Sequence, residues 1–264
     1  MLTADERERI QARARAAIGK RTMRSDPWWV QPATTFVVLG AFILYATWAA
    51  FQNADYYVEP YLSPFYSPCI AAICDHVTLP VVGDFWKISP ALLILPFPLA
   101  FRMTCYYYRK AYYRSFWLSP PACAVGEPHG AYTGETRFPL IFQNVHRYAF
   151  YLALPFPLIL LWDAIQGFRF PEGFGIGLGT GVLLLNAVLL GLYTVSCHSC
   201  RHLFGGHVNL FSKAPMRHRT WKLVSRLNER HMLFAWVSLV WVGLTDVYVR
   251  LVATGVISDP KVIF

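Results

Sequence analysis

Long apolar runs alternate with shorter polar and basic segments along most of the chain. A helix needs about 20 apolar residues to cross a hydrocarbon core about 30 Å thick, and five runs reach or approach that length. They are residues 34–51, 88–108, 145–162, 174–197 and 232–253. A membrane-spanning helix satisfies its own backbone hydrogen bonds. The pattern therefore predicts an all-α fold, a polytopic membrane helix bundle with five transmembrane helices.

Composition and the flanking segments agree with this prediction. Hydrophobic residues make up 55% of the 264 positions and charged residues 15%, a balance outside the range of ordinary soluble domains. The first apolar run follows a long basic stretch, so we predict no cleavable signal. We expect residues 1–33 to form a cytoplasmic amphipathic or interfacial segment, residues 34–254 the five-helix bundle, and residues 255–264 an external tail.

The distribution of positive charge predicts the orientation. Most of the 24 lysines and arginines lie before the first span, between the second and third, or between the fourth and fifth. The loops on the other side and the C-terminus hold only Lys87, Arg169 and Lys261. Since cytoplasmic loops carry the positive excess, we predict a cytoplasmic N-terminus and an external C-terminus. Topology and lipid headgroups thus explain the net charge of +9, and no nucleic acid partner is predicted.

Charges inside the apolar runs are few. Asp246 and Arg250 lie four residues apart on the fifth run and therefore share a helix face. Because they lie near its predicted external end, we predict a structural ion pair. A proton path is the alternative, since charged groups in a membrane are functional candidates.

Soft metal ligands cluster where the fourth run ends. Cys197, His198, Cys200 and His202 lie within six residues, and thiolates with imidazoles favour zinc, haem or iron–sulfur groups. On a continuous helix the two thiols share one face and the two imidazoles another, because successive residues are rotated by about 100°. Either the helix unwinds here, or the thiols take their other partners from different spans.

Histidines on two other spans supply such partners. His146 opens the third span and His231 the fifth, and the predicted topology brings both to the cytoplasmic face where the fourth span ends. The predicted ligands are Cys197, Cys200, His146 and His231, with His198 and His202 as substitutes. Such a set suits a structural zinc site, a Rieske-type [2Fe–2S] cluster, or a haem with His146 and His231 (or His198) as axial ligands. Buried thiols and interfacial histidines without a metal are the remaining interpretation.

A second ligand set lies in the predicted external loop. Cys69, Cys74 and His76 place two thiols and an imidazole close together. Extracytoplasmic thiols usually oxidise, so a disulfide between Cys69 and Cys74 competes with metal binding there. Both interpretations stay open.

Two segments carry a family resemblance, CHSCRHLFGG at 197–206 and LNERHMLFAWVSLVW at 227–241. With five spans and histidines at cytoplasmic helix ends, the chain resembles the single membrane anchor of a succinate:quinone oxidoreductase, respiratory complex II. More narrowly, it resembles the actinobacterial succinate dehydrogenase anchor whose membrane domain holds a Rieske-type cluster. This resemblance implies a multi-pass protein of a bacterial plasma membrane. The resemblance implies a subunit without a complete active site that passes electrons from a flavoprotein subunit and an iron–sulfur subunit, through this cluster, to quinone. It makes Cys197 and Cys200 the thiolate ligands and His146 and His231 the imidazole ligands.

The same resemblance implies a quinone pocket at the level of the lipid headgroups. Trp28, Trp29 and Tyr106 can stack on a quinone ring and Arg109 can polarise a carbonyl, although each also suits an ordinary interfacial anchor. The basic cytoplasmic face can bind the soluble subunits and anionic lipid, and a homo-oligomer of the whole complex stays open. Two alternative functions remain, a haem b-bearing cytochrome anchor of the same enzyme class and a small membrane transporter or zinc-stabilised scaffold.

Overall fold

The computed structural model describes residues 3, 24–68, 77–78, 87–128, 137–138 and 140–264. The chain forms two compact units. Unit 1 comprises residues 1–41 and 102–145, and unit 2 comprises residues 42–101 and 146–264. Each unit is described by itself below.

Four helical segments are long and apolar enough to cross a membrane among the described residues. They are α2 (Val30–Gln52), the segment Ile141–Gln166, α8 (Leu178–Val195) and α11 (His231–Ala253). The segment Ile141–Gln166 contains most of η5 (Leu140–Val145), then α6 (His146–Ala153) and α7 (Phe156–Gln166). Protein buries only 17% of the most apolar window of α2 and 44% of that of α11. Most of this apolar surface therefore faces outward, which suits contact with lipid.

The second predicted span, residues 88–108, is not one continuous helix. It divides into α3 (Pro90–Ile94), α4 (Pro96–Met103) and α5 (Tyr106–Ala111). Proline lacks the N–H that a helix interior needs and its ring clashes with the preceding turn, which accounts for the break before Pro96. The described part of the chain thus has four long apolar helices rather than the predicted five.

Residues 90–101 nevertheless extend between the two ends of unit 2. At one end Ser89, just before α3, donates to the Tyr66 hydroxyl, with 3.3 Å between the oxygens. At the other end the Phe101 ring in α4 stacks on His146, with centroids 5.0 Å apart. This broken segment therefore reaches from the end of η1 (Pro64–Tyr66) to the start of α6.

Helix α8 packs against both α7 and α11 and forms the centre of unit 2. Its N-terminal turn lies on the Tyr61 ring, and a Cβ atom on Gly179 would lie 2.6 Å from that ring. Glycine therefore permits this close approach. The predicted fourth span began too early, because residues 173–177 form a strand and the helix starts at Leu178.

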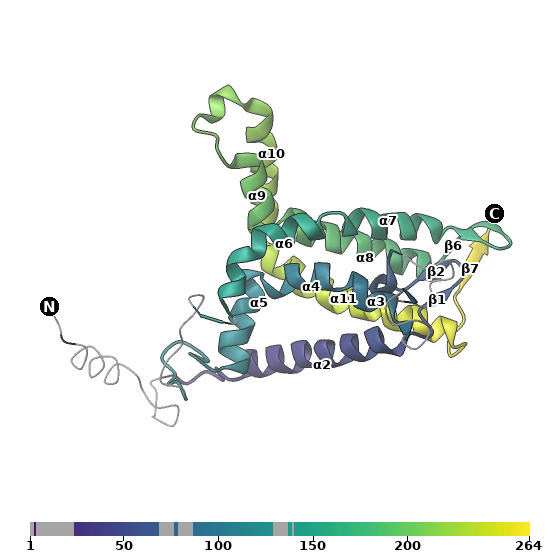
Figure 1. Cartoon of the computed structure of the whole chain (residues 1–264), viewed down its shortest axis with the longest axis horizontal. Coiled ribbons are helices and arrows are strands. Elements are labelled where there is room, and N and C mark those ends of the chain that lie inside the picture. The colour runs from purple at the N-terminus through teal and green to yellow at the C-terminus, as the bar shows by residue number, and fades with distance from the viewer. Residues whose placement is uncertain (1–2, 4–23, 69–76, 79–86, 129–136, 139) are drawn as a thin grey trace. The chain divides into compact units, whose positions relative to one another are not determined.

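Short antiparallel strands cover one end of unit 2 (Figure 1). Strand β1 (Tyr57–Val58) pairs with β2 (Tyr61–Leu62). Strand β6 (Gly173–Gly177) pairs with both β5 (Arg169–Phe170) and β7 (Lys261–Ile263). Strands β3 (Val77–Thr78) and β4 (Lys87–Ile88) form a third pair. The predicted C-terminal tail is therefore folded into a sheet, with Gly175 opposite Ile263.

A charged network is buried at this same end, which we call the arginine end. Arg250 Nε lies 2.8 Å from Asp246 Oδ2, as the spacing predicted. Asp246 is fully buried and also accepts from the Tyr45 and Ser63 hydroxyls. Arg250 further donates to the Ala54 carbonyl at 2.6 Å. The network ties α11 to the end of α2 and to the loop that follows it.

A helical hairpin extends from the opposite end of unit 2. It consists of α9 (His198–Gly205), η6 (Phe211–Lys213) and α10 (Pro215–Asn228), and it runs across the direction of α8 (Figure 1). Gly205 lies against Trp221, where a Cβ atom would come within 2.4 Å of the indole ring. Arg217 closes the hairpin by donating to the Phe204 and Gly206 carbonyls at 2.9 and 2.8 Å.

Candidate functional site

The helix is interrupted at the cysteine motif. Helix α8 ends at Val195, and Cys197 has an extended backbone with φ −66° and ψ 149° as the N-cap of α9. Its sulfur accepts from the Ser199 amide at 3.4 Å. The sequence left open an unwound helix or partners from other spans, and the helix is interrupted here over Ser196 and Cys197. Because its backbone is extended, the Cys197 side chain does not follow the direction that a continuous α8 would give it. It contacts a residue of another span instead.

That other span is the third. His146 Nε2 lies 3.1 Å from Cys197 Sγ, and the thiol is 1% exposed. His146 is the first residue of α6, as predicted. The structure thus brings together one predicted thiol and one predicted imidazole from different spans.

His231 begins α11, also as predicted, and is buried. Its Nδ1 lies 2.7 Å from the Ser196 hydroxyl, and its ring stacks on Tyr193 with centroids 5.2 Å apart. The Ser196 carbonyl in turn accepts from the Asn228 side-chain amide at 2.7 Å. Ser196 therefore orients this imidazole, and Asn228 holds the turn that carries Ser196.

A series of ring contacts connects the two histidines. His146 stacks on Phe101, Phe101 contacts Tyr193 at 5.1 Å between centroids, and Tyr193 stacks on His231. We call the region of His146, Cys197 and His231 the imidazole end of unit 2. Two aromatic rings link its histidines, so a haem held between them as axial ligands would require those rings to move.

The remaining predicted ligands lie on α9. Cys200 is buried, and burial raises the pKa of its thiol. Burial and the nearby Arg201 lower the pKa of His198. His202 faces His207, with ring centroids 5.7 Å apart. No three histidine, cysteine, aspartate or glutamate side chains among the described residues are placed to hold one metal ion.

These side chains as placed therefore do not gather the predicted set of two cysteine and two histidine ligands. One thiol–imidazole pair is formed, and Cys200 and His231 do not join it in a group. The predicted four-ligand set stays a prediction. The second set, Cys69, Cys74 and His76, and the predicted disulfide lie outside the described residues.

Sequence reasoning missed the residues that hold the imidazoles. Phe101 lies in the broken second run and Tyr193 inside the fourth, where an aromatic residue in an apolar run gives no signal of its own. Ser196 could have been found, since a hydroxyl directly before Cys197 has the chemistry to orient a histidine.

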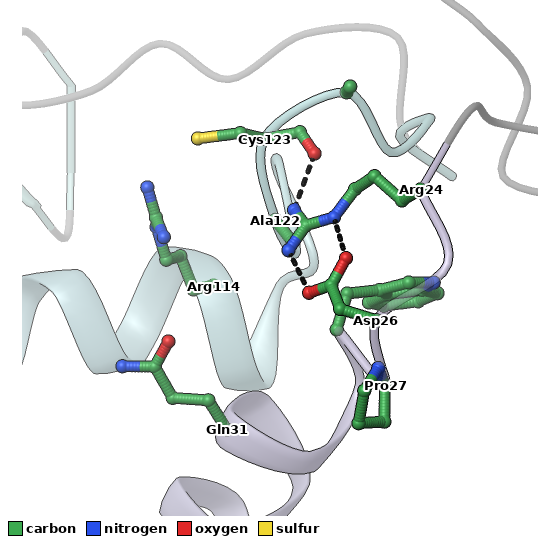
Figure 2. Close-up of a pocket in the computed structure, with 9 residues that line it drawn as sticks. Arg24, Asp26, Pro27, Gln31, Arg114, Ala122 and Cys123 are labelled. Carbon is green, nitrogen blue, oxygen red and sulfur yellow. Dashed lines mark hydrogen bonds and ion pairs between the residues drawn. The ribbon is translucent and has the colours of Figure 1, made fainter.

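The four predicted quinone residues are not gathered into one pocket. Arg109 lies over the Tyr106 ring, 4.3 Å from its centroid, within α5. Trp28 lines a separate cavity of about 530 Å³ in unit 1 (Figure 2). Trp29 is 59% exposed and is not part of that lining. The quinone assignment stays a prediction.

Comparison with known proteins identifies the family. A family model of the actinobacterial succinate dehydrogenase subunit SdhC matches residues 30–255. A chain of the Mycobacterium smegmatis Sdh1 complex in the apo form is 52% identical, with a TM-score of 0.82, over 94% of this chain and 96% of that chain. Comparison with curated protein sequences gives no significant match. The resemblance drawn from the sequence is confirmed, and the chain belongs to the actinobacterial SdhC family of succinate dehydrogenase membrane anchors.

Proposed function

We propose that this membrane anchor passes electrons from the iron–sulfur subunit of its complex to quinone, through the imidazole end of unit 2. The observation that carries the proposal is the 3.1 Å contact between His146 and Cys197. It joins two soft donors from different spans in a buried place, and thiolates and imidazoles are the side chains that bind transition metals. Because the solved relative belongs to the Sdh1 complex, we propose that this chain also assembles with a flavoprotein subunit and an iron–sulfur subunit.

We further propose five membrane crossings, with the broken segment α3–α4 as the second. Its contacts at both ends of unit 2, to Tyr66 and to His146, support this. A cytoplasmic N-terminus and an external C-terminus follow from the positive-inside rule. The hairpin α9–α10, rich in arginine and lysine, then lies on the cytoplasmic side, and the strands β5–β7 lie outside.

The proposed electron carrier is a Rieske-type [2Fe–2S] cluster. Bound in such an anchor, it would supply one-electron transfer at a higher potential than a four-cysteine cluster. His146 and Cys197 are the described residues that best suit it, and Cys200 and His231 would complete the inner set only after local rearrangement. Cys69, Cys74 and His76 form the competing external set.

Low-temperature electron paramagnetic resonance on the purified, dithionite-reduced complex tests this proposal. We expect a Rieske-type signal that is lost in Cys197→Ser and His146→Gln and kept in Cys69→Ser. The matched control is Cys123→Ser, which removes an exposed thiol of unit 1 that is in neither set. A signal lost in Cys69→Ser but kept in Cys197→Ser would transfer the site to the external loop.

Metal analysis and a visible spectrum on the same sample separate the remaining alternatives. Haem bands would keep the electron-transfer function and replace the cluster with haem b. Zinc without iron would contradict the electron-transfer proposal and favour a zinc-stabilised scaffold.

For the quinone headgroup we propose contact with Tyr106 and Arg109. The stacked pair supports this because it presents an aromatic face and a guanidinium on the same short helix. These are the groups that can stack on a quinone ring and polarise its carbonyl.

A further inference from the structure

A cavity in unit 1 lies outside the proposed electron path. It has a volume of about 530 Å³, within the range of small-molecule sites. Its walls come from four places: the segment before α2, the first turn of α2, and two later parts of unit 1. The lining residues are Arg24, Asp26, Pro27, Trp28, Gln31, Arg114, Ala122, Cys123 and Ala124.

On one side of the cavity, a positive and a negative side chain cancel each other's charge. Arg24 donates to both carboxylate oxygens of Asp26, with Nε 2.7 Å from Oδ1, and also to the Cys123 carbonyl at 2.7 Å. This bidentate contact lowers the pKa of the Asp26 carboxyl. Asp26 therefore carries its negative charge at neutral pH and is engaged with Arg24, as Figure 2 shows.

The other side of the cavity carries an uncompensated cation. Arg114 lies on the π-helix η3 (Tyr112–Phe116), and Figure 2 shows its side chain apart from the Arg24–Asp26 pair. Its Nε is buried and has no hydrogen-bond partner among the described residues. Because the charges of Arg24 and Asp26 cancel, Arg114 gives the lining of the cavity a net positive charge. A buried donor of this kind is costly unless a ligand satisfies it.

The cavity lies at the depth of the lipid headgroups. Trp28 and Trp29 directly precede α2, and such tryptophans mark the membrane interface. From Val30 onward the helix is apolar, and Phe36 and Val37 are 50% and 64% exposed. Gln31, on the first turn of α2, therefore lies where the helix enters the hydrocarbon.

We infer that this cavity binds the phosphate group of an anionic phospholipid, with Arg114 and Gln31 as donors and Trp28 covering the headgroup. A phosphodiester carries one negative charge and strong acceptor oxygens, which match the one uncompensated guanidinium and the amide. A neutral quinone would leave that charge without a counterion. Basic pockets on the cytoplasmic side of membrane proteins bind such headgroups.

Native mass spectrometry of the whole complex, purified in mild detergent, tests this inference. We expect Arg114→Gln to lose one bound phosphatidylglycerol per anchor. The matched control is Arg137→Gln, which removes the same charge from an exposed position of unit 1 and should keep the lipid. Gln31→Leu removes one donor without changing any charge, so we expect weaker lipid retention with the complex intact. An unchanged lipid count in both Arg114→Gln and Gln31→Leu would overturn the inference.

Two further measurements identify the ligand. Added to delipidated complex, phosphatidylglycerol vesicles should raise the unfolding temperature in an Arg114-dependent manner, whereas inorganic phosphate and phosphatidylcholine vesicles should not. Equal protection by inorganic phosphate would make this a free-phosphate site and overturn the lipid assignment. A raised KM for quinone in Arg114→Gln, with the lipid count unchanged, would make the cavity a quinone site and would also overturn it.

Discussion

The arginine end and the imidazole end of unit 2 bury polar groups of different kinds. At the arginine end, Arg250 is matched to Asp246 and to acceptors from the end of α2 and the loop after it. At the imidazole end, the buried groups are imidazoles and thiols, whose neutral forms can be buried at much lower cost than a charge. Their partners are stacked rings, one hydroxyl and one thiol.

This difference separates a structural network from the site that we propose for electron transfer. A buried ion pair whose donors and acceptors are matched holds helices in register and leaves little capacity for a ligand. Buried imidazoles and thiols add less to stability, yet they are the side chains that bind transition metals and move protons. The comparison predicts that substitutions at the arginine end will mainly lower stability, and that substitutions at the imidazole end will mainly lower quinone reduction.

The largest effect on stability is expected at Arg250. Arg250→Met leaves the fully buried Asp246 carboxylate without its cation. Breaking a buried pair in this way costs about 3–5 kcal/mol. We expect a lower unfolding temperature and a lower yield of assembled complex.

The double variant Arg250→Met with Asp246→Asn provides the control. It removes both charges, so most of the lost stability should return. An unchanged unfolding temperature in Arg250→Met alone would show that the arginine end does not stabilise the bundle.

At the imidazole end, the largest effect is expected on activity. His146→Ala removes the imidazole that contacts Cys197. We expect quinone reduction to fall about 100-fold, the scale on which residues around a metal site act. Succinate oxidation measured with a soluble dye should remain, because that step belongs to other subunits in the proposed function.

Ser196→Ala is the matched comparison at the same end. It removes the hydroxyl that bonds His231 and leaves the His146–Cys197 pair in place. We expect a loss of about 1 kcal/mol in stability and a smaller loss of quinone reduction than in His146→Ala. Normal quinone reduction in His146→Ala would remove His146 from the electron path.

The smallest effect is expected at the surface of the sheet formed by β5, β6 and β7. Lys261 on β7 donates to Glu172 at 2.8 Å, and this hydrogen bond lowers the pKa of the Glu172 carboxyl. A depressed folded-state pKa contributes stability above the unfolded value of about 4.3 and loses it as the pH falls through the folded value. Both side chains are exposed, so the contribution is small.

A thermal scan against pH measures this contribution. As the pH falls below about 4.3, the unfolding temperature of the wild type should decrease slightly more than that of Glu172→Gln. Parallel curves for the two proteins would show that this ion pair adds no stability to the sheet.

The sequence predicted the positions that depend on local pattern. His146 and His231 begin their helices as expected, and the Asp246–Arg250 pair forms at its helical spacing. These predictions succeeded because apolar periodicity and a four-residue spacing act within one segment.

The rest depends on contacts between segments. The rings of Phe101 and Tyr193 contact the histidines only because α4 and α8 meet at the imidazole end. The tail becomes a strand because β6 offers it a partner. A single sequence contains no signal for either contact, since each residue alone suits any apolar helix or edge strand.

The arginine network also has a consequence for biogenesis. Charged residues raise the free energy of inserting a helix into the bilayer by about 2.5–3.5 kcal/mol each at the helix centre. The groups that offset this for α11, namely Tyr45, Ser63 and the Ala49 and Ala54 carbonyls, are translated long before it. Helix α11 therefore inserts most favourably once α2 is in place, which imposes an order on assembly at the translocon.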